Sequence, residues 1–121
     1  MTQVLLVGAG GGLGAMMRWW VAGAISGRMG SATPAGIFIV NISGCLLIGL
    51  LEGILSQRGW DGWKPLLIAG LLGGYTTFST FGAQTFEMIR SGGFGLAALN
   101  AAGSVVAGLL AVWAGLAMSG R

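Results

Sequence analysis

The chain consists mostly of apolar runs that are each about as long as one membrane crossing. These runs cover approximately residues 4–25, 35–55, 65–89 and 94–118 of the 121 residues. A transmembrane helix needs about 20 predominantly apolar residues. Only 7% of the residues are charged, whereas a soluble domain carries about 25%. The sequence therefore predicts an all-α membrane protein, a single integral membrane domain over residues 1–121 with four transmembrane helices in a lipid bilayer.

The few ionisable residues exclude most catalytic chemistry. Histidine is absent, and the only acidic residues are Glu52, Asp61 and Glu87. General acid–base catalysis, metal-dependent hydrolysis and catalytic triads all need such groups, so we expect no enzyme. The net charge of +3 comes from a few basic residues, most of them near the ends of the apolar runs. It therefore indicates membrane topology and no nucleic-acid binding.

Residues 73–81, with the sequence Gly-Gly-Tyr-Thr-Thr-Phe-Ser-Thr-Phe, interrupt the third apolar run. Seven of the nine are Gly, Thr, Ser or Tyr, which are poor residues for a helix interior. We therefore expect a broken third helix, with the break at residues 73–79. Broken backbone within a bilayer must be buried in protein or line a water-filled path, because each unsatisfied N–H or C=O group costs several kcal/mol. The break indicates an ion or substrate site.

The first apolar run contains a glycine cluster from Gly8 to Gly14. A dinucleotide-binding loop that starts at Gly8 and Gly10 needs its third glycine where Leu13 stands, so that interpretation fails. The pairs Gly8/Gly12 and Gly10/Gly14 have GxxxG spacing, which lets a second helix approach closely. The cluster therefore predicts helix–helix packing.

Isolated polar side chains lie within the apolar runs. Arg18 needs a partner, a carbonyl cluster or water at its depth, unless it extends to the interface beside the neighbouring tryptophans. Asn41 must find hydrogen bonds, either between helices or along a polar path. Asn100 and Ser104 lie one turn apart on one helical face and predict a polar stripe. Glu87, near the end of the third run, marks a vestibule or is simply solvated.

The basic residues near the ends of the runs are divided almost evenly between the two sides of the membrane. With four crossings, Arg58, Lys64 and Arg121 share one side, and Arg28 and Arg90 share the other. The positive-inside rule then gives little preference for either orientation. A chain that inserts both ways can pair with its own inverted copy, as inverted repeats do within larger transporters. The sequence therefore predicts dual topology.

Four segments, in the same order, resemble the Fluc (CrcB) family of fluoride channels. They are Gly14-Ala15-x-x-Arg18, Val40-Asn41 followed by Gly44, Gly73-Gly74-x-Thr76-Thr77-Phe78-Ser79-Thr80-Phe81, and Asn100 with Ser104. The third segment is highly specific, and the resemblance extends over nearly the whole chain.

This resemblance implies an antiparallel, dual-topology homodimer, a multi-pass protein of the bacterial inner membrane. Its two pores conduct fluoride passively out of the cytoplasm. By the same resemblance, Phe78 and Phe81 line the anion path as an aromatic box, with Asn41 as a neighbouring donor.

The resemblance also implies a polar track and a cation site. The further residues of the fluoride pore are Ser79, Thr80, Asn100, Ser104 and, towards a pore mouth, Glu87. Backbone carbonyls of Gly73 and Thr76 from both subunits hold a structural Na⁺. One position departs from this pattern, because Gly108, one turn beyond Ser104, has no hydroxyl to extend the track.

Physical chemistry supports an uncharged anion path. Fluoride is small and strongly hydrated, and hydroxyl and amide donors replace its water without the fixed positive charge that would trap it. Phe78 and Phe81 lie three residues apart on one helical face, so their ring edges, the positive part of the ring quadrupole, can face an anion together. The ordinary alternative is that the two rings only pack.

Two other function classes are compatible with four crossings. A small multidrug-type proton-coupled exporter also inserts in both orientations, but it needs a carboxylate within the membrane. No acidic residue lies in the middle of an apolar run. A non-transporting assembly subunit that uses its GxxxG faces for packing leaves the polar segment at residues 73–81 unexplained.

Overall fold

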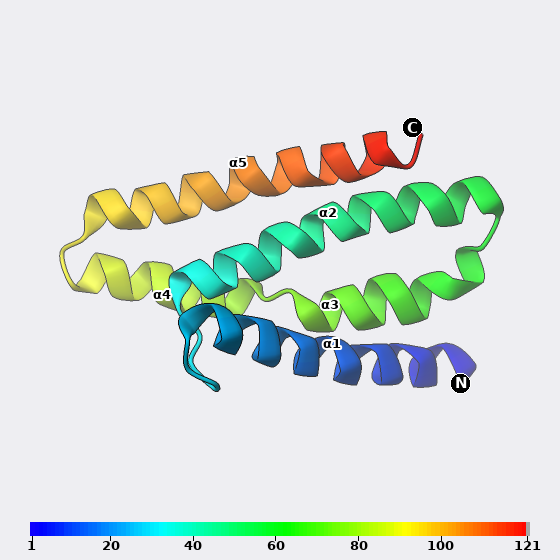
Figure 1. The fold of residues 1–121 in the computed structure, drawn as a ribbon, viewed down its shortest axis with the longest axis horizontal. Coiled ribbons are helices and arrows are strands. Elements are labelled where there is room, and N and C mark those ends of the chain that lie inside the picture. The colour runs from blue at the N-terminus through cyan, green and yellow to red at the C-terminus, as the bar shows by residue number, and fades with distance from the viewer. Residues whose placement is uncertain (121) are drawn as a thin grey trace.

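Over the residues that the structure describes, 1–120, the chain is helical apart from short turns, and no β-strand occurs there (Figure 1). The elements of this computed structural model are α1 (Thr2–Ser26), α2 (Pro34–Arg58), η1 (Asp61–Trp63), η2 (Pro65–Leu72), α3 (Gly73–Tyr75), α4 (Phe78–Arg90) and α5 (Phe94–Met118). Of the two η segments, η1 is a 3₁₀-helix and η2 is a π-helix. Arg121, which enters the predicted charge balance, lies outside the described residues.

Four helical segments are long and apolar enough to cross a membrane, as the sequence predicts. They are Thr2–Ser26, Pro34–Arg58, Asp61–Arg90 and Phe94–Met118. At a rise of 1.5 Å per residue, a helix of 25 residues is about 37 Å long, which exceeds the hydrocarbon core of about 30 Å.

Local sequence signals set several of the helix ends. Pro34 occupies the first turn of α2, and the Thr33 side chain accepts a hydrogen bond from the Gly36 amide at 3.2 Å. Both features are typical of helix starts. α1 and α2 are each followed by a capping glycine, Gly27 and Gly59. These glycines have left-handed φ angles of 66° and 67°, which glycine adopts without steric cost.

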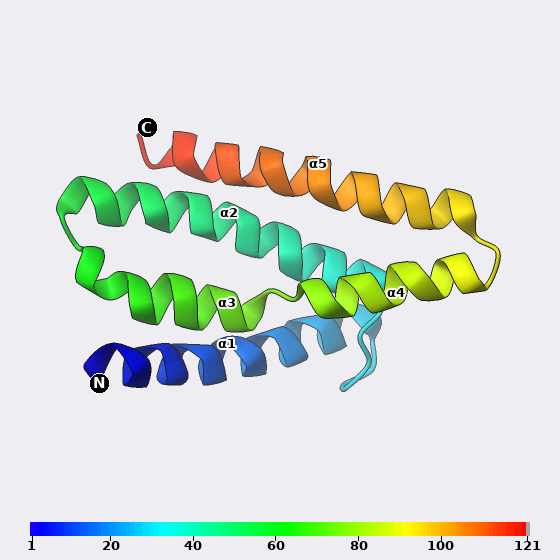
Figure 2. The same ribbon diagram turned by 180° about the vertical axis from the view of Figure 1, so that it is seen from behind.

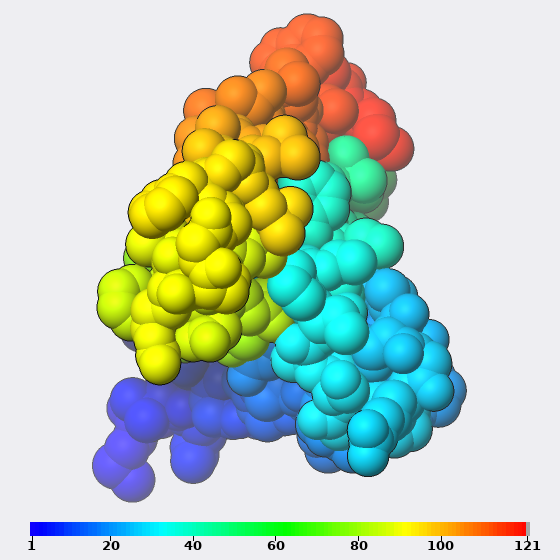
Figure 3. Space-filling model, turned by 90° about the vertical axis from the view of Figure 1, so that its left-hand side faces the viewer, coloured from blue at the N-terminus to red at the C-terminus, as the bar shows by residue number. Residues whose placement is uncertain are grey.

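The segments form a bundle in which α2 is central. Figures 1 and 2 show α5 along one side of α2 and the chain from η2 to α4 along the other, with α1 next to η2 and α3. The space-filling view along the bundle shows the yellow end of α4 and start of α5 beside the cyan segment that holds the 27–33 loop and the start of α2 (Figure 3). The start of α1 and the turn after α2 lie at one end of the bundle, and the turn between α4 and α5 lies at the other. The 27–33 loop projects from the side of the bundle, nearer to the second end.

Glycines allow close contact between α1 and the η2–α3 segment. A Cβ atom at Gly10 would collide with the Leu66 carbonyl oxygen, and one at Gly14 would collide with the Leu71 carbonyl oxygen. This confirms helix packing for that GxxxG pair. By contrast, a Cβ atom at Gly8 or Gly12 would meet no atom within 4 Å, so the second pair faces away from the protomer.

Two consecutive residues interrupt the helical path between α3 and α4. Thr76 has φ −81° and ψ 158°, and Thr77 has φ −149° and ψ 113°, so both are extended. We refer to these two residues as the interruption. It is shorter than the expected 73–79, because Gly73 to Tyr75 is helical. The helix continues that far because the Thr76 amide still donates to the Leu72 carbonyl, at 3.0 Å.

Candidate functional site

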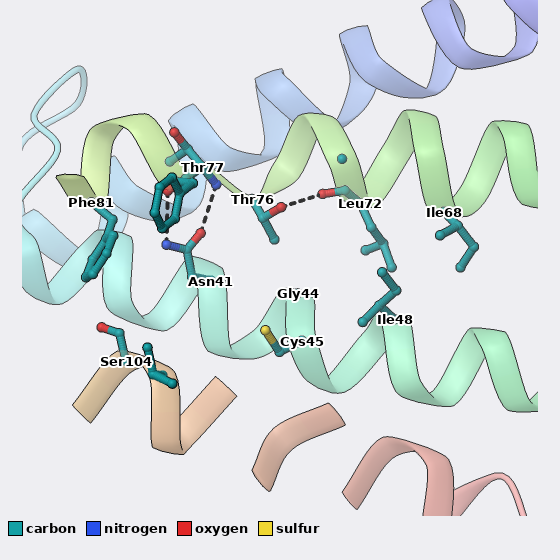
Figure 4. Close-up of a pocket in the computed structure, with 13 residues that line it drawn as sticks. Asn41, Gly44, Cys45, Ile48, Ile68, Leu72, Thr76, Thr77, Phe81 and Ser104 are labelled. Atoms are coloured by element: carbon teal, nitrogen blue, oxygen red, sulfur yellow. Dashed lines mark hydrogen bonds between the residues drawn. The ribbon is translucent and has the colours of Figure 1, made fainter. Parts of the chain in front are cut away.

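A cavity of about 330 Å³ lies beside the interruption. Figure 4 shows it between α2 and the chain from η2 to α4, with α5 opposite. Apart from the thiol of Cys45, its polar side chains are those of Asn41, Thr76, Thr77 and Ser104. No charged side chain occurs among the lining residues that the structure describes. The cavity is therefore apolar with a few hydrogen-bonding groups.

Two phenylalanine rings from the start of α4 line this cavity. The centroids of Phe78 and Phe81 are 5.6 Å apart, and the ring planes are tilted by 43°. Phe81 packs against the buried cluster that contains Val40 and Tyr75. Phe78, in contrast, is 83% exposed. One ring is thus held by the protomer, and the other projects from it.

The Asn41 side chain forms two hydrogen bonds with the backbone of Thr77. Its Oδ1 accepts from the Thr77 amide at 2.8 Å, and its Nδ2 donates to the Thr77 carbonyl at 3.1 Å (Figure 4). An amide that pairs both its ends with one extended residue imitates the pairing of adjacent β-strands. Asn41 therefore bonds to the interruption itself, across 36 residues of sequence.

Hydroxyl groups cluster around the start of α4. Thr77 Oγ1 accepts from the Thr80 amide at 3.3 Å and so caps the helix. It also lies 3.3 Å from Ser79 Oγ and 3.1 Å from Thr80 Oγ1. Neither Ser79 nor Thr80 lines the cavity. Both hydroxyl groups contact the hydroxyl of Thr77, and Thr77 lines the cavity.

Arg18 has a partner at the interruption. Its Nη1 donates to the Thr76 carbonyl oxygen at 3.1 Å. Because the carbonyl end of a helix carries a partial negative charge, a guanidinium is favourable there. Of the two alternatives that the sequence left open, this geometry supports a carbonyl partner over extension to the interface.

A second contact between α2 and the third segment lies next to Asn41. The hydroxyl groups of Ser43 and Tyr75 are 2.9 Å apart, and Tyr75 is only 6% exposed. Ser43, Tyr75 and Thr77 are not among the site residues predicted from the sequence. Thr77 carries a recognisable signal, since a threonine before a helical run is a frequent N-cap. The pairing of Ser43 with Tyr75, 32 residues apart, leaves no local pattern.

The predicted stripe on α5 divides between two environments. Ser104 lines the cavity. Asn100 donates through Nδ2 to Thr85 Oγ1 at 2.8 Å and lines a separate, mostly apolar groove between α2, α4 and α5. Its amide therefore joins α5 to α4.

Glu87 does not reach the cavity. Its carboxylate lies 3.4 Å from the Arg90 guanidinium, and its side chain is 68% exposed. It stands in the last turn of α4, at the opposite end of that helix from Phe78. The pair is solvated and local.

Backbone carbonyls are the groups here that suit a cation. No cluster of three or more His, Cys, Asp or Glu residues occurs within residues 1–120. Gly73 and Thr76 both line the cavity, at the carbonyl end of the helix formed by η2 and α3. Carbonyl oxygens in such positions replace the hydration shell of a hard cation.

The chain is similar to known proteins over almost its full length. A family model described as "CrcB-like protein, Camphor Resistance (CrcB)" matches residues 5–116. The "Fluoride-specific ion channel FluC" of Solibacter usitatus is 42% identical over 98% of this chain and 99% of its own. The FluC of Methylobacterium nodulans is 44% identical over 98% and 96%. "Fluoride-specific ion channel FluC 1" of Symbiobacterium thermophilum is 47% identical over 94% of both chains.

Proposed function

Because the chain belongs to the CrcB-like protein family, we propose that it conducts fluoride passively out of the bacterial cytoplasm. It is a multi-pass membrane protein, and its relatives are named ion channels and not enzymes. We place it in the inner membrane, where such a channel lowers cytoplasmic fluoride.

The observation that carries this proposal is the composition of the cavity. Phe78 and Phe81 share it with the hydrogen-bonding groups of Asn41 and Ser104, and no charged residue among positions 1–120 lines it. Fluoride needs donors that replace its water without holding it, and ring edges are weakly positive. The fluoride path therefore runs along the two rings and past Asn41 and Ser104. The resemblance to fluoride channels, and not the cavity, adds Ser79, Thr80 and Asn100 to the polar track and Glu87 towards a mouth.

A second copy of the chain completes the pore. Phe78 lines the cavity and is nevertheless 83% exposed in the protomer, so a second subunit would enclose its ring. The glycine face at Gly8 and Gly12 is also open. The nearly even distribution of basic residues supports insertion in both orientations. These features favour an antiparallel homodimer with two pores, in which the interruption breaks the third span at membrane depth.

A structural Na⁺ at the dimer centre fits the carbonyls of this chain. Gly73 and Thr76 would hold it through backbone oxygens from both subunits, and the ion would supply positive charge between two helix ends. The Thr76 carbonyl oxygen already accepts a hydrogen bond from the Arg18 guanidinium. A carbonyl oxygen has two lone pairs, so this hydrogen bond leaves one for a cation.

The acidic residues argue against a proton-coupled exporter. Glu52 and Asp61 both lie 2.9 Å from the Lys64 ammonium, and Glu87 lies beside Arg90. Every acidic residue of the chain is thus paired near the end of a helix. None is placed to exchange a proton with a substrate within the membrane.

A flux assay tests the proposal. Purified protein is reconstituted into liposomes loaded with either potassium fluoride or potassium chloride, and efflux is started with valinomycin. We expect rapid fluoride efflux with no proton gradient, and retention of chloride. Efflux that depends on an imposed proton gradient would support the exporter instead. Fluoride retention equal to that of protein-free liposomes would overturn both.

A further inference from the structure

We propose that Asn41 is a positioning residue that maintains the interruption and releases the Gly73 carbonyl. Its side chain takes the amide of Thr77 that a continuous helix would direct to Gly73. The geometric part is independent of fluoride conduction. Only the use of the released carbonyl by a cation rests on the proposed function.

The first step concerns the hydrogen bonds of the backbone. In an α-helix each amide donates to the carbonyl four residues earlier. The Thr76 amide follows this rule and donates to Leu72 at 3.0 Å. The Thr77 amide would continue it by donating to Gly73, but it donates to Asn41 Oδ1 at 2.8 Å. The helical pattern therefore ends where the asparagine side chain intervenes.

The second step concerns why asparagine suits this position. Thr77 is extended, with φ −149° and ψ 113°, and it is the N-cap of α4. Its amide therefore has no partner within α4 and needs one from elsewhere. A primary amide carries an acceptor and a donor, and both are used here. Aspartate keeps the acceptor but has no donor, and leucine has neither. Nδ2 has a second hydrogen, which remains available to an anion in the cavity.

The third step concerns the residues of α2 next to Asn41, which contact the backbone segment that ends in the interruption. A Cβ atom at Gly44 would collide with the Thr76 methyl group, so any larger residue there would force Thr76 or the helix to shift. Ser43 is bonded to Tyr75 at 2.9 Å. Together with Asn41, these residues contact each position from Tyr75 to Thr77. One face of α2 thus holds the non-helical backbone in place.

The consequence lies at Gly73. The amides three and four residues after Gly73, which would bond its carbonyl in a 3₁₀- or α-helix, are those of Thr76 and Thr77, and they donate to Leu72 and Asn41. An amide carbonyl within a bilayer needs a partner, since each unsatisfied group costs several kcal/mol. A cation supplies that partner, and Asn41 keeps the competing amide away.

Hydrogen–deuterium exchange at the Thr77 amide tests the geometric part without any flux. We compare the wild type with Asn41→Leu and Asn41→Asp in lipid nanodiscs. Gln57→Leu is the matched control. Gln57 lies on the same helix as Asn41, and its exposed side-chain amide donates to the Ser119 carbonyl at 2.9 Å. We expect exchange to accelerate at least about tenfold in Asn41→Leu, the factor for losing one hydrogen bond. It should stay near the wild-type rate in Asn41→Asp and Gln57→Leu.

An unchanged rate at Thr77 in folded Asn41→Leu would overturn the proposal. If the leucine variant does not fold, Asn41→Asp decides alone. Retained protection supports the acceptor role, and fast exchange in a folded aspartate variant refutes it.

Thermal stability as a function of Na⁺ tests the link to Gly73, again with no fluoride present. Wild type, Asn41→Asp and Gln57→Leu should share one half-saturating Na⁺ concentration, and Asn41→Leu should need at least about tenfold more. An equal requirement in Asn41→Leu would refute the link. If the wild type shows no response to Na⁺, the proposed sodium site fails, while the exchange experiment still decides the role of Asn41.

Discussion

The guanidinium of Arg18 and the carbonyl oxygen of Thr76 are joined by a hydrogen bond of 3.1 Å across 58 residues of sequence. It brings a permanent positive charge to the end of the helix formed by η2 and α3. Thr76 thereby gains a charged donor at the point where helical hydrogen bonding stops. The contact ties α1 to the interruption and explains how an arginine is accommodated so deep in an apolar run.

Replacing Arg18 tests the importance of this contact. Arg18→Leu removes the donor and leaves the Thr76 carbonyl without it, so we expect a loss of about 1.5–3 kcal/mol in the free energy of unfolding. Arg18→Gln keeps a neutral donor and should lose less. Chemical unfolding in detergent, followed by circular dichroism, measures both. Equal stability of Arg18→Leu and the wild type would contradict the assigned role.

The two phenylalanines should separate conduction from stability. We expect Phe78→Ile and Phe81→Ile each to lower fluoride efflux by at least about tenfold, which corresponds to about 1.4 kcal/mol in a barrier. Only Phe81→Ile should also lower the unfolding temperature, because Phe81 packs on the buried cluster and Phe78 is 83% exposed.

The matched control for these variants is Phe94→Ile. Phe94 is the first residue of α5 and is 67% exposed. The Phe94→Ile variant should therefore conduct fluoride as the wild type does. Normal fluoride efflux in both Phe78→Ile and Phe81→Ile would remove the aromatic path from the proposal.

The two GxxxG pairs of α1 predict opposite responses to alanine. A Cβ atom at Gly14 would collide with the Leu71 carbonyl, whereas one at Gly12 meets no atom within 4 Å. Gly14→Ala should therefore destabilise the protein by about 1–3 kcal/mol, as overpacking does. Gly12→Ala should leave protomer stability unchanged. Thermal unfolding of the two variants side by side provides the comparison, and the reverse order would show that the packing of α1 is wrong.

The charge balance predicts that orientation can be redirected. Adding arginines to the 27–33 loop, as in Met29→Arg with Ser31→Arg, should bias insertion towards one orientation and reduce fluoride efflux from cells. Co-expression with a variant biased the opposite way should restore it, because the two then form the antiparallel pair. Reporter fusions at the termini measure the orientation. Full activity of a variant present in one orientation alone would contradict the antiparallel dimer.

Local sequence was sufficient for the features that depend on neighbouring residues. The four membrane-spanning segments follow from the length and hydropathy of the apolar runs, because a helix satisfies its own backbone within a bilayer. The contact between the Phe78 and Phe81 rings follows from their spacing of three residues on one helix. The GxxxG spacing predicted close packing, but it did not distinguish Gly10 from Gly8.

Tertiary structure alone decided the details of the site. Residues 73–81 predicted a broad break, yet the helix persists to Tyr75 and only Thr76 and Thr77 are extended. The position of the interruption depends on which amide meets the Asn41 side chain, and that is set by the packing of α2, 36 residues earlier. The partner of Arg18 likewise depends on how α1 lies against η2 and α3. A hydrogen bond depends on distance and direction in space, so pairs far apart in sequence are defined only when the helices have packed.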